Sequence, residues 1–133
     1  EEVLTALYLH YGCRSYDLSP LKRLSETVVR CSGIEVAKNK AVVGKNAFSH
    51  ESGIHIAAVL NDPACYEPFP PETVGQERRF VFGKHSGATA LKHFIRGPES
   101  KVDEEMLTQL LEEVKGYKGL TLNELKELLL RKK

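Results

Sequence analysis

The chain has 133 residues, and its 19 Lys and Arg nearly balance 18 Asp and Glu. This balance gives no electrostatic argument for binding nucleic acid or an anionic membrane, and no apolar run is long enough to span a bilayer. The length suits one compact domain or a piece of a larger protein, and no secretory signal is visible. Three widely spaced cysteines favour reduced thiols in a cytoplasmic protein (Cys13, Cys31 and Cys65).

Apolar residues at helical spacing predict the first two elements. Residues 1–11 carry an apolar face and stop at Gly12. Ser19 and Pro20 then supply an N-cap followed by proline at the first helical position. This predicts a second helix, which Gly33 closes. The apolar stripe of this helix consists of Leu21, Leu24, Val28 and Cys31.

The segment 44–55 concentrates histidines, a carboxylate and hydroxyls between two apolar runs. Residues 41–43 before it predict a short strand or extended piece. A helix is predicted after it, from about Ser52 to Leu60. Polar, titratable residues between apolar runs are poorly suited to a core and well suited to a site.

Two histidines in this segment are candidates for chemistry. Glu51 and His55 lie four apart near the predicted helix start, so the carboxylate is placed to orient the imidazole. The alternative is a solvated or capping role for both His50 and His55. A metal site is disfavoured because the two histidines are five apart, whereas ligands on one helical face are four apart.

Proline then controls the backbone over residues 63–75, which hold four prolines and must be extended and irregular. A short strand is predicted near 66–69, and at most one helical turn follows Pro71. Tyr66 stands within this segment. In such a loop a tyrosine is usually a packing residue whose hydroxyl meets water.

A short strand is predicted at 79–82, followed by the turn Gly83–Gly87 and a helix. Free N–H groups and the helix dipole make this turn a plausible anion seat, and Lys84 adds positive charge. The alternative is a plain turn with a solvated lysine. The turn is not a Walker motif, because His85 separates the lysine from Ser86.

Two amphipathic helices are predicted in the last part of the chain. The first begins near Val102 and ends at Gly116. Thr121 and Glu124 form a capping box that opens the second. The leucine stripes predict core or an interface with another chain. The predicted fold class is therefore α+β, mostly α, a small helical domain with a few short strands.

Three motifs in this order and at close spacing resemble a known family. They are Asn46 to His55, Tyr66 to Gly75, and Gly83 to Gly87. Together they resemble the region after the catalytic barrel in homocitrate synthases and 2-isopropylmalate synthases, over roughly residues 1–97. The homocitrate synthases, including the nitrogen-fixation type, are the most similar.

The resemblance implies a Claisen-type condensation of acetyl-CoA with a 2-oxo acid, 2-oxoglutarate being preferred. The oxo acid is expected on a divalent metal (Mg, Mn or Zn) in a TIM barrel, which is a partner domain or subunit in a homo- or hetero-oligomer. The family's catalytic histidine and tyrosine fall on His55 and Tyr66, and we add Glu51 to them. Expected substrate-binding or CoA-binding residues are Asn46, His50, Ser52, Lys84, His85 and Ser86.

The sequence contains no barrel, so the resemblance implies a detached, C-terminal accessory part that holds no metal and is inactive in isolation. It implies three parts: a helical linker at 1–38, a lid-like catalytic part at 39–97 and a helical hairpin at 98–133. A leucine-regulated 2-isopropylmalate synthase is expected to carry a further regulatory domain of about a hundred residues. This sequence contains no such domain, which favours the homocitrate synthase type. The alternatives are a 2-isopropylmalate, citramalate or Re-type citrate synthase, and more remotely a helical interaction or DNA-binding module.

Overall fold

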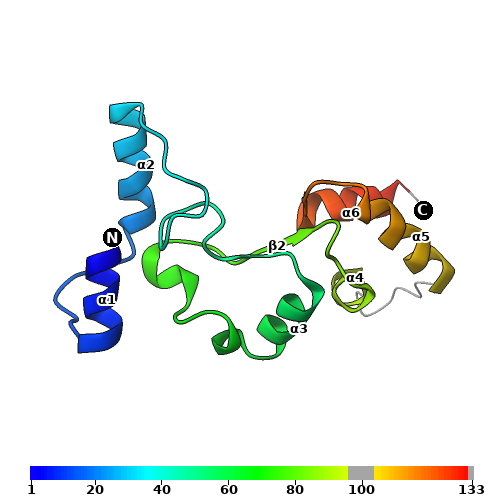
Figure 1. Ribbon diagram of the computed structural model, residues 1–133, viewed down its shortest axis with the longest axis horizontal. Coiled ribbons are helices and arrows are strands. Elements are labelled where there is room, and N and C mark those ends of the chain that lie inside the picture. Colours follow the sequence, from blue (N-terminus) through cyan, green and yellow to red (C-terminus); the bar gives the residue numbers. More distant parts are fainter. Residues whose placement is uncertain (96–103, 132–133) are drawn as a thin grey trace. The chain divides into compact units, whose positions relative to one another are not determined.

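The computed structural model describes residues 1–95 and 104–131 (Figure 1). The chain forms two compact units. Unit 1 consists of Glu1–Ser49 with Phe69–Arg78, and unit 2 of His50–Pro68 with Arg79–Lys133. The structure is 54% helical and contains a three-stranded sheet, which confirms the α+β, mostly α class.

Unit 1 begins with the two predicted helices, α1 (Glu2–Tyr11) and α2 (Leu21–Ser32). Each ends at a glycine in the left-handed conformation, as the sequence predicts. The prediction that Ser19 is the N-cap of α2 is wrong. Pro20 occupies that position, while the Ser19 hydroxyl donates to the Asp17 carboxylate at 2.9 Å. The aspartate also accepts the Ser19 N–H at 2.9 Å, so the serine is held in a turn before the helix.

The prediction of a strand or extended piece at 41–43 is wrong. These residues form a turn in which the Gly44 N–H donates to the Lys40 carbonyl at 3.0 Å. Val42 has a φ of 64°, a left-handed conformation that is rare for a β-branched residue. A side chain at Gly44 would place its Cβ 2.4 Å from the Lys40 carbonyl oxygen. The tight turn therefore requires glycine at this position.

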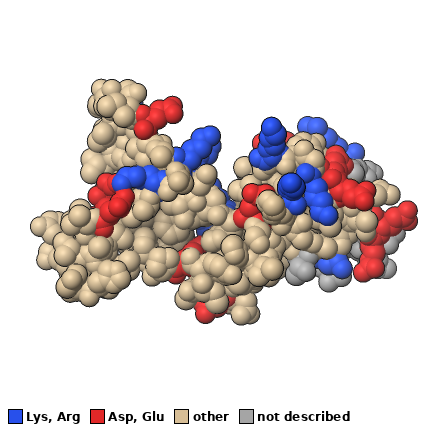
Figure 2. Space-filling model, viewed as in Figure 1, with Lys and Arg blue, Asp and Glu red and all other residues tan. Residues whose placement is uncertain are grey.

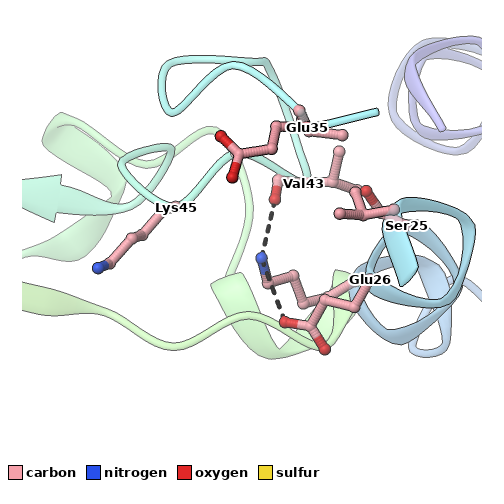
Figure 3. Close-up of a pocket in the computed structure, with 9 residues that line it drawn as sticks. Ser25, Glu26, Glu35, Val43 and Lys45 are labelled. Carbon is pink, nitrogen blue, oxygen red and sulfur yellow. Dashed lines mark hydrogen bonds and ion pairs between the residues drawn. The ribbon is translucent and has the colours of Figure 1, made fainter. Parts of the chain in front are cut away.

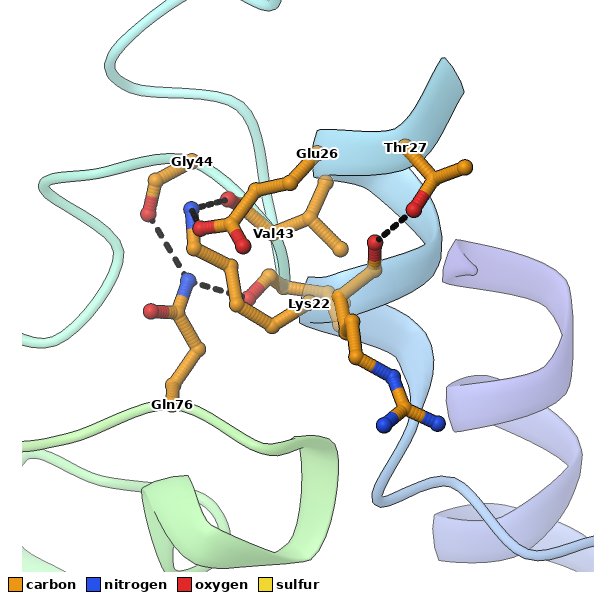
Figure 4. Close-up of polar contacts among 8 residues, drawn as sticks. Lys22, Glu26, Thr27, Val43, Gly44 and Gln76 are labelled. Carbon is orange, nitrogen blue, oxygen red and sulfur yellow. Dashed lines mark hydrogen bonds and ion pairs between the residues drawn. The ribbon is translucent and has the colours of Figure 1, made fainter. Parts of the chain in front are cut away.

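Side chains from two other segments hold this turn (Figure 4). The Gln76 amide donates to the carbonyls of Val42 and Gly44 at 3.1 and 3.0 Å. The Lys22 ammonium, from α2, donates to the Val43 carbonyl at 3.1 Å. Three successive carbonyls thus find donors outside any sheet, which offsets the strain at Val42.

The core of unit 1 joins α2 to the segment that returns at 69–78. The short 3₁₀ helix η2 (Pro71–Val74) buries Val74 and confirms the single turn predicted after Pro71. Gly75 follows with a φ of 74°, and a Cβ there would lie 2.2 Å from the Ser19 carbonyl oxygen. The buried apolar residues of this core are Leu18, Leu21, Val43, Phe48 and Val74.

Unit 2 holds a small sheet in the order β1-β2-β3. The strands are β1 (Ser49–His50), β2 (Arg79–Phe82) and β3 (Leu120–Thr121). β2 and β3 are antiparallel and pair Phe82 with Leu120. The prediction of a strand at 79–82 is confirmed, whereas β1 and β3 were not foreseen.

The prediction of a strand near 66–69 is wrong. The 3₁₀ helix η1 (Pro63–Cys65) precedes this segment, and the backbone N–H groups of Tyr66 and Glu67 both donate to the Pro63 carbonyl, at 3.1 and 2.9 Å. These two N–H groups are consequently unavailable to a sheet partner, and the chain turns instead.

The helices of unit 2 are α3 (Gly53–Asn61), α4 (Ala88–Ile95), α5 (Glu104–Lys115) and α6 (Leu122–Leu130). All four were predicted, although Val102 lies outside the described residues. The capping box of Thr121 and Glu124 is confirmed. The buried cluster of this unit consists of Ile56, Phe82, Ala90, Leu91, Ile95, Leu107, Leu110, Val114, Leu120 and Leu125.

The two compact units do not follow the predicted boundaries of 1–38, 39–97 and 98–133. The middle part is shared, because residues 69–78 rejoin the core of unit 1. The units group residues by contact, whereas the predicted parts group them by expected role. The division by role stays a prediction.

Charged side chains of both signs are interspersed on the face shown in Figure 2. This mixture agrees with the near-zero net charge and shows no large basic stripe on that face. Among the helices that the structure describes, none is long and apolar enough to cross a membrane.

Candidate functional site

The start of α3 positions the first candidate side chain. Ser52 is the N-cap, in an extended conformation, and the helix begins at Gly53. Ile56 and Val59 bury the inner face of this helix in unit 2. His55 stands in the first turn, next to the buried face, and is exposed to solvent. The imidazole is therefore held on a packed helix while remaining accessible.

The return of the chain after α3 positions Tyr66. The Asp62 carboxylate caps η1 by accepting the Ala64 N–H at 3.0 Å. The ring of Tyr66 then lies against the ring of His55, with centroids 4.2 Å apart and planes tilted by 43°. The prediction that the two rings face the same space is confirmed, and Tyr66 is 45% exposed. Neither ring is buried in a core.

Glu51 does not contact His55 as the sequence predicts, and its catalytic role stays a prediction. Its carboxylate lies beside Gly83, where a Cβ would come within 3.2 Å of Oε1. Among the described residues, no hydrogen bond or ion pair joins Glu51 to His55. The reason is that α3 begins at Gly53, so Glu51 precedes the helix and the four-residue spacing does not place it on the face of His55.

His50 lies inside unit 2 and pairs with Glu67. The imidazole Nε2 is 3.1 Å from Glu67 Oε1, and the two side chains are 10% and 2% exposed. The Phe80 ring flanks the imidazole, with centroids 6.2 Å apart. The sequence interpretation missed Glu67. The available signal was a carboxylate directly after Tyr66 in a proline-rich segment.

The Gly83–Gly87 turn is closed by its own serine. The buried Ser86 hydroxyl accepts the Gly83 N–H at 2.8 Å, and the Ser86 N–H donates to the Gly83 carbonyl at 3.0 Å. This hydroxyl thus has a structural partner already. Lys84 and His85 are exposed at the tip of the turn and remain free to meet a ligand.

The same turn lies against the start of α3. The Gly53 N–H faces the His85 carbonyl at 3.4 Å. A Cβ on Gly53 would lie 2.9 Å from the Gly87 nitrogen, so the close approach of the two backbones requires glycine here. The structure therefore brings the third sequence motif to the helix that carries His55.

Comparison with known proteins identifies the family. Residues 42–119 match the family model described as "Homocitrate synthase post-HMGL domain-like". The chain belongs to this family. The matched range covers more than half of the chain and includes every predicted site residue.

Individual relatives of this post-HMGL domain carry several names. Homocitrate synthase AksA of Methanosarcina mazei is 53% identical over 115 residues, covering 86% of this chain and 28% of the relative. The "Probable 2-isopropylmalate synthase" of Ignicoccus hospitalis is 40% identical over 127 residues, covering 93% and 32%. The (R)-citramalate synthase CimA of Methanocaldococcus jannaschii is 41% identical over 124 residues, covering 90% and 25%.

The chain thus spans about a quarter to a third of the length of these relatives. The resemblance to homocitrate and 2-isopropylmalate synthases that the motifs indicate is confirmed. The different names of the relatives leave the 2-oxo acid open.

Asn46 belongs to unit 1 of this post-HMGL domain. It is exposed in a turn, where its N–H donates to the Lys38 carbonyl at 2.8 Å and its carbonyl accepts the Ser49 N–H at 3.1 Å. These are backbone bonds, so they leave the side-chain amide available. The predicted roles of Asn46 and Ser52 in substrate binding stay predictions.

Unit 1 also contains a hollow of about 240 Å³ between α2 and residues 35–45 (Figure 3). It includes none of the predicted site residues. Lys22 in its wall is held by the Val43 carbonyl and by Glu26, 3.4 Å away. Lys45 extends away from Glu26. The hollow is therefore lined by valine side chains, the paired Lys22 and Glu26, and the charged side chains of Glu35 and Lys45.

Proposed function

We propose that this chain is the C-terminal part of an acyltransferase that condenses acetyl-CoA with a 2-oxo acid, with 2-oxoglutarate, giving homocitrate, as the preferred substrate. The observation that carries the proposal is the exposed pair of His55 and Tyr66, whose ring centroids are 4.2 Å apart, in a member of the post-HMGL domain family. The chain would supply acid and base groups to a TIM-barrel partner.

The chemistry follows from the two side chains. The methyl group of acetyl-CoA is a weak carbon acid, so its deprotonation needs a placed base, and neutral imidazole is suited to that role. The His55 imidazole takes the proton. The Tyr66 hydroxyl then donates a hydrogen bond to the negative charge that develops on oxygen. Their shared position at the surface lets both groups reach a substrate held by another domain.

The divalent metal of the proposed reaction belongs outside this chain. Among the described residues, no three His, Cys, Asp or Glu side chains are grouped so as to hold a metal ion. In this proposal the metal site lies in the barrel, as the resemblance to the synthases implies. No step that we assign to this chain passes through it.

Charge at the Gly83–Gly87 turn supports the binding of CoA. Lys84 and His85 are exposed there, and the turn touches the start of α3, which carries His55. CoA carries phosphate groups, which a lysine ammonium attracts. In this proposal the turn holds the anionic part of CoA, while His55 meets its acetyl group.

Replacing Tyr66 by Phe tests the hydroxyl. Tyr66→Phe should lower kcat of the complete enzyme by about 10²–10³-fold, as loss of one oxyanion donor does. The substituted residue keeps the aromatic ring that lies against His55, so the free energy of unfolding should change by less than about 0.5 kcal/mol. Steady-state kinetics and urea unfolding measure the two effects. Tyr117→Phe is the control, because that tyrosine is similarly exposed in the same unit at 42%, and it should leave kcat unchanged.

The substrate is tested with the complete enzyme and acetyl-CoA. Release of the free CoA thiol is followed with 2-oxoglutarate, 2-oxoisovalerate, pyruvate and oxaloacetate as acceptors. We expect the largest kcat/KM with 2-oxoglutarate. A larger value with 2-oxoisovalerate or pyruvate would assign the chain to a 2-isopropylmalate or citramalate synthase, and no thiol release with any acceptor would contradict the proposal.

A further inference from the structure

His50 and Glu67 join the two ends of the segment that carries both candidate catalytic rings. They are 17 positions apart, and their side chains meet at 3.1 Å. His55 lies five positions after the first, and Tyr66 directly precedes the second. One side-chain contact thus closes a loop whose interior holds the whole His55–Tyr66 pair.

The side chains that make this contact are almost completely buried. The side chains of His50 and Glu67 are 10% and 2% exposed, whereas His55 and Tyr66 are both exposed. A hydrogen bond to a carboxylate in such surroundings is stronger than in water, and deleting one partner leaves a buried polar group behind. The burial also argues against direct contact of His50 with substrate.

Both partners are tied to rigid structure on their other sides. His50 belongs to β1, which pairs with β2 in the sheet, and its ring lies near that of Phe80 on β2. The Glu67 N–H donates to the Pro63 carbonyl of η1 at 2.9 Å. A shift of Glu67 would consequently move the backbone at Tyr66, while the position of His50 relative to the sheet stays fixed.

We propose that His50 and Glu67 are positioning residues that hold Tyr66 against His55, in place of the substrate-binding role expected for His50. The proposal rests on the proposed function, because it assigns the pair an effect on that reaction. It assigns neither residue a contact with substrate. The effect is on rate, since a small misplacement of two reacting groups costs more in the transition state than in substrate binding.

Three variants of Glu67 test this in the complete enzyme. Glu67→Ala removes the contact and should lower kcat more than fivefold, with KM for the 2-oxo acid within about twofold. Glu67→Gln keeps an oxygen at the same reach and should restore most of the loss. If Glu67→Ala does not fold, Glu67→Asp is used instead. Its side chain keeps the negative charge but is one methylene too short to reach His50. The kcat of this variant should also fall more than fivefold.

A double-mutant cycle with His55→Ala separates positioning from general loss of stability. If Glu67 acts through His55, the Glu67 substitution should cost much less kcat in the His55→Ala background. Glu124→Ala is the control, since it weakens the α6 capping box, and it should lower the melting temperature without changing kcat.

Two outcomes overturn the inference: kcat within fivefold of the parent for Glu67→Ala (or for Glu67→Asp where Glu67→Ala does not fold), or losses that multiply fully in the cycle. Failure of the proposed function is distinguishable from these. It would show as a His55→Ala variant whose kcat equals that of the parent.

Discussion

His55→Ala should lower kcat of the complete enzyme by about 10²–10⁴-fold, the usual cost of losing a general base, and should leave KM for the 2-oxo acid nearly unchanged. The reason is the role of the residue. Proton removal from acetyl-CoA takes place only in the transition state, whereas the proposed barrel holds the oxo acid in the ground state. The exposed position of His55 on a packed helix supports a role in catalysis over one in folding.

Steady-state kinetics with both substrates varied measure this effect. His10→Ala is the matched control, because His10 is also exposed and stands on a helix in unit 1; its kcat should equal that of the parent. If His55→Ala keeps kcat within about threefold, less than 1 kcal/mol of barrier, the catalytic role of His55 is contradicted.

Phe82→Ala should have the largest effect on folding, a loss of about 3–5 kcal/mol in the free energy of unfolding. The side chain is fully buried in unit 2. It meets the ring of Phe94 edge-on, with centroids 5.4 Å apart, and its backbone pairs with Leu120 of β3. Truncation removes apolar contact and leaves a cavity that the surrounding helices fill only in part.

Urea unfolding followed by far-UV circular dichroism measures this loss. Tyr117→Ala is the matched aromatic deletion in unit 2, and it should cost less than about 1 kcal/mol because the tyrosine is 42% exposed. Should Phe82→Ala cost no more than Tyr117→Ala, the described core would not be the one that stabilises unit 2.

Sequence alone determined the elements whose signals are local. Apolar residues at helical spacing indicated α1 and α2. Gly12 and Gly33 indicated where these helices end, because glycine readily adopts the left-handed conformation that both residues have in the structure. The reciprocal hydrogen bonds of Thr121 and Glu124 depend only on a three-residue spacing, and the capping box is present as predicted. Motif order likewise indicated the family, because it is a property of the chain itself.

Tertiary structure decided the features that depend on partners distant in sequence. The apolar run at 41–43 is a turn because Gln76 and Lys22 supply donors to its carbonyls, which no local pattern reveals. The same holds for Glu67, whose side chain contacts His50, a residue 17 positions earlier in the sequence. Periodicity reports which faces of a segment are apolar; only folding determines which polar groups then meet across those faces.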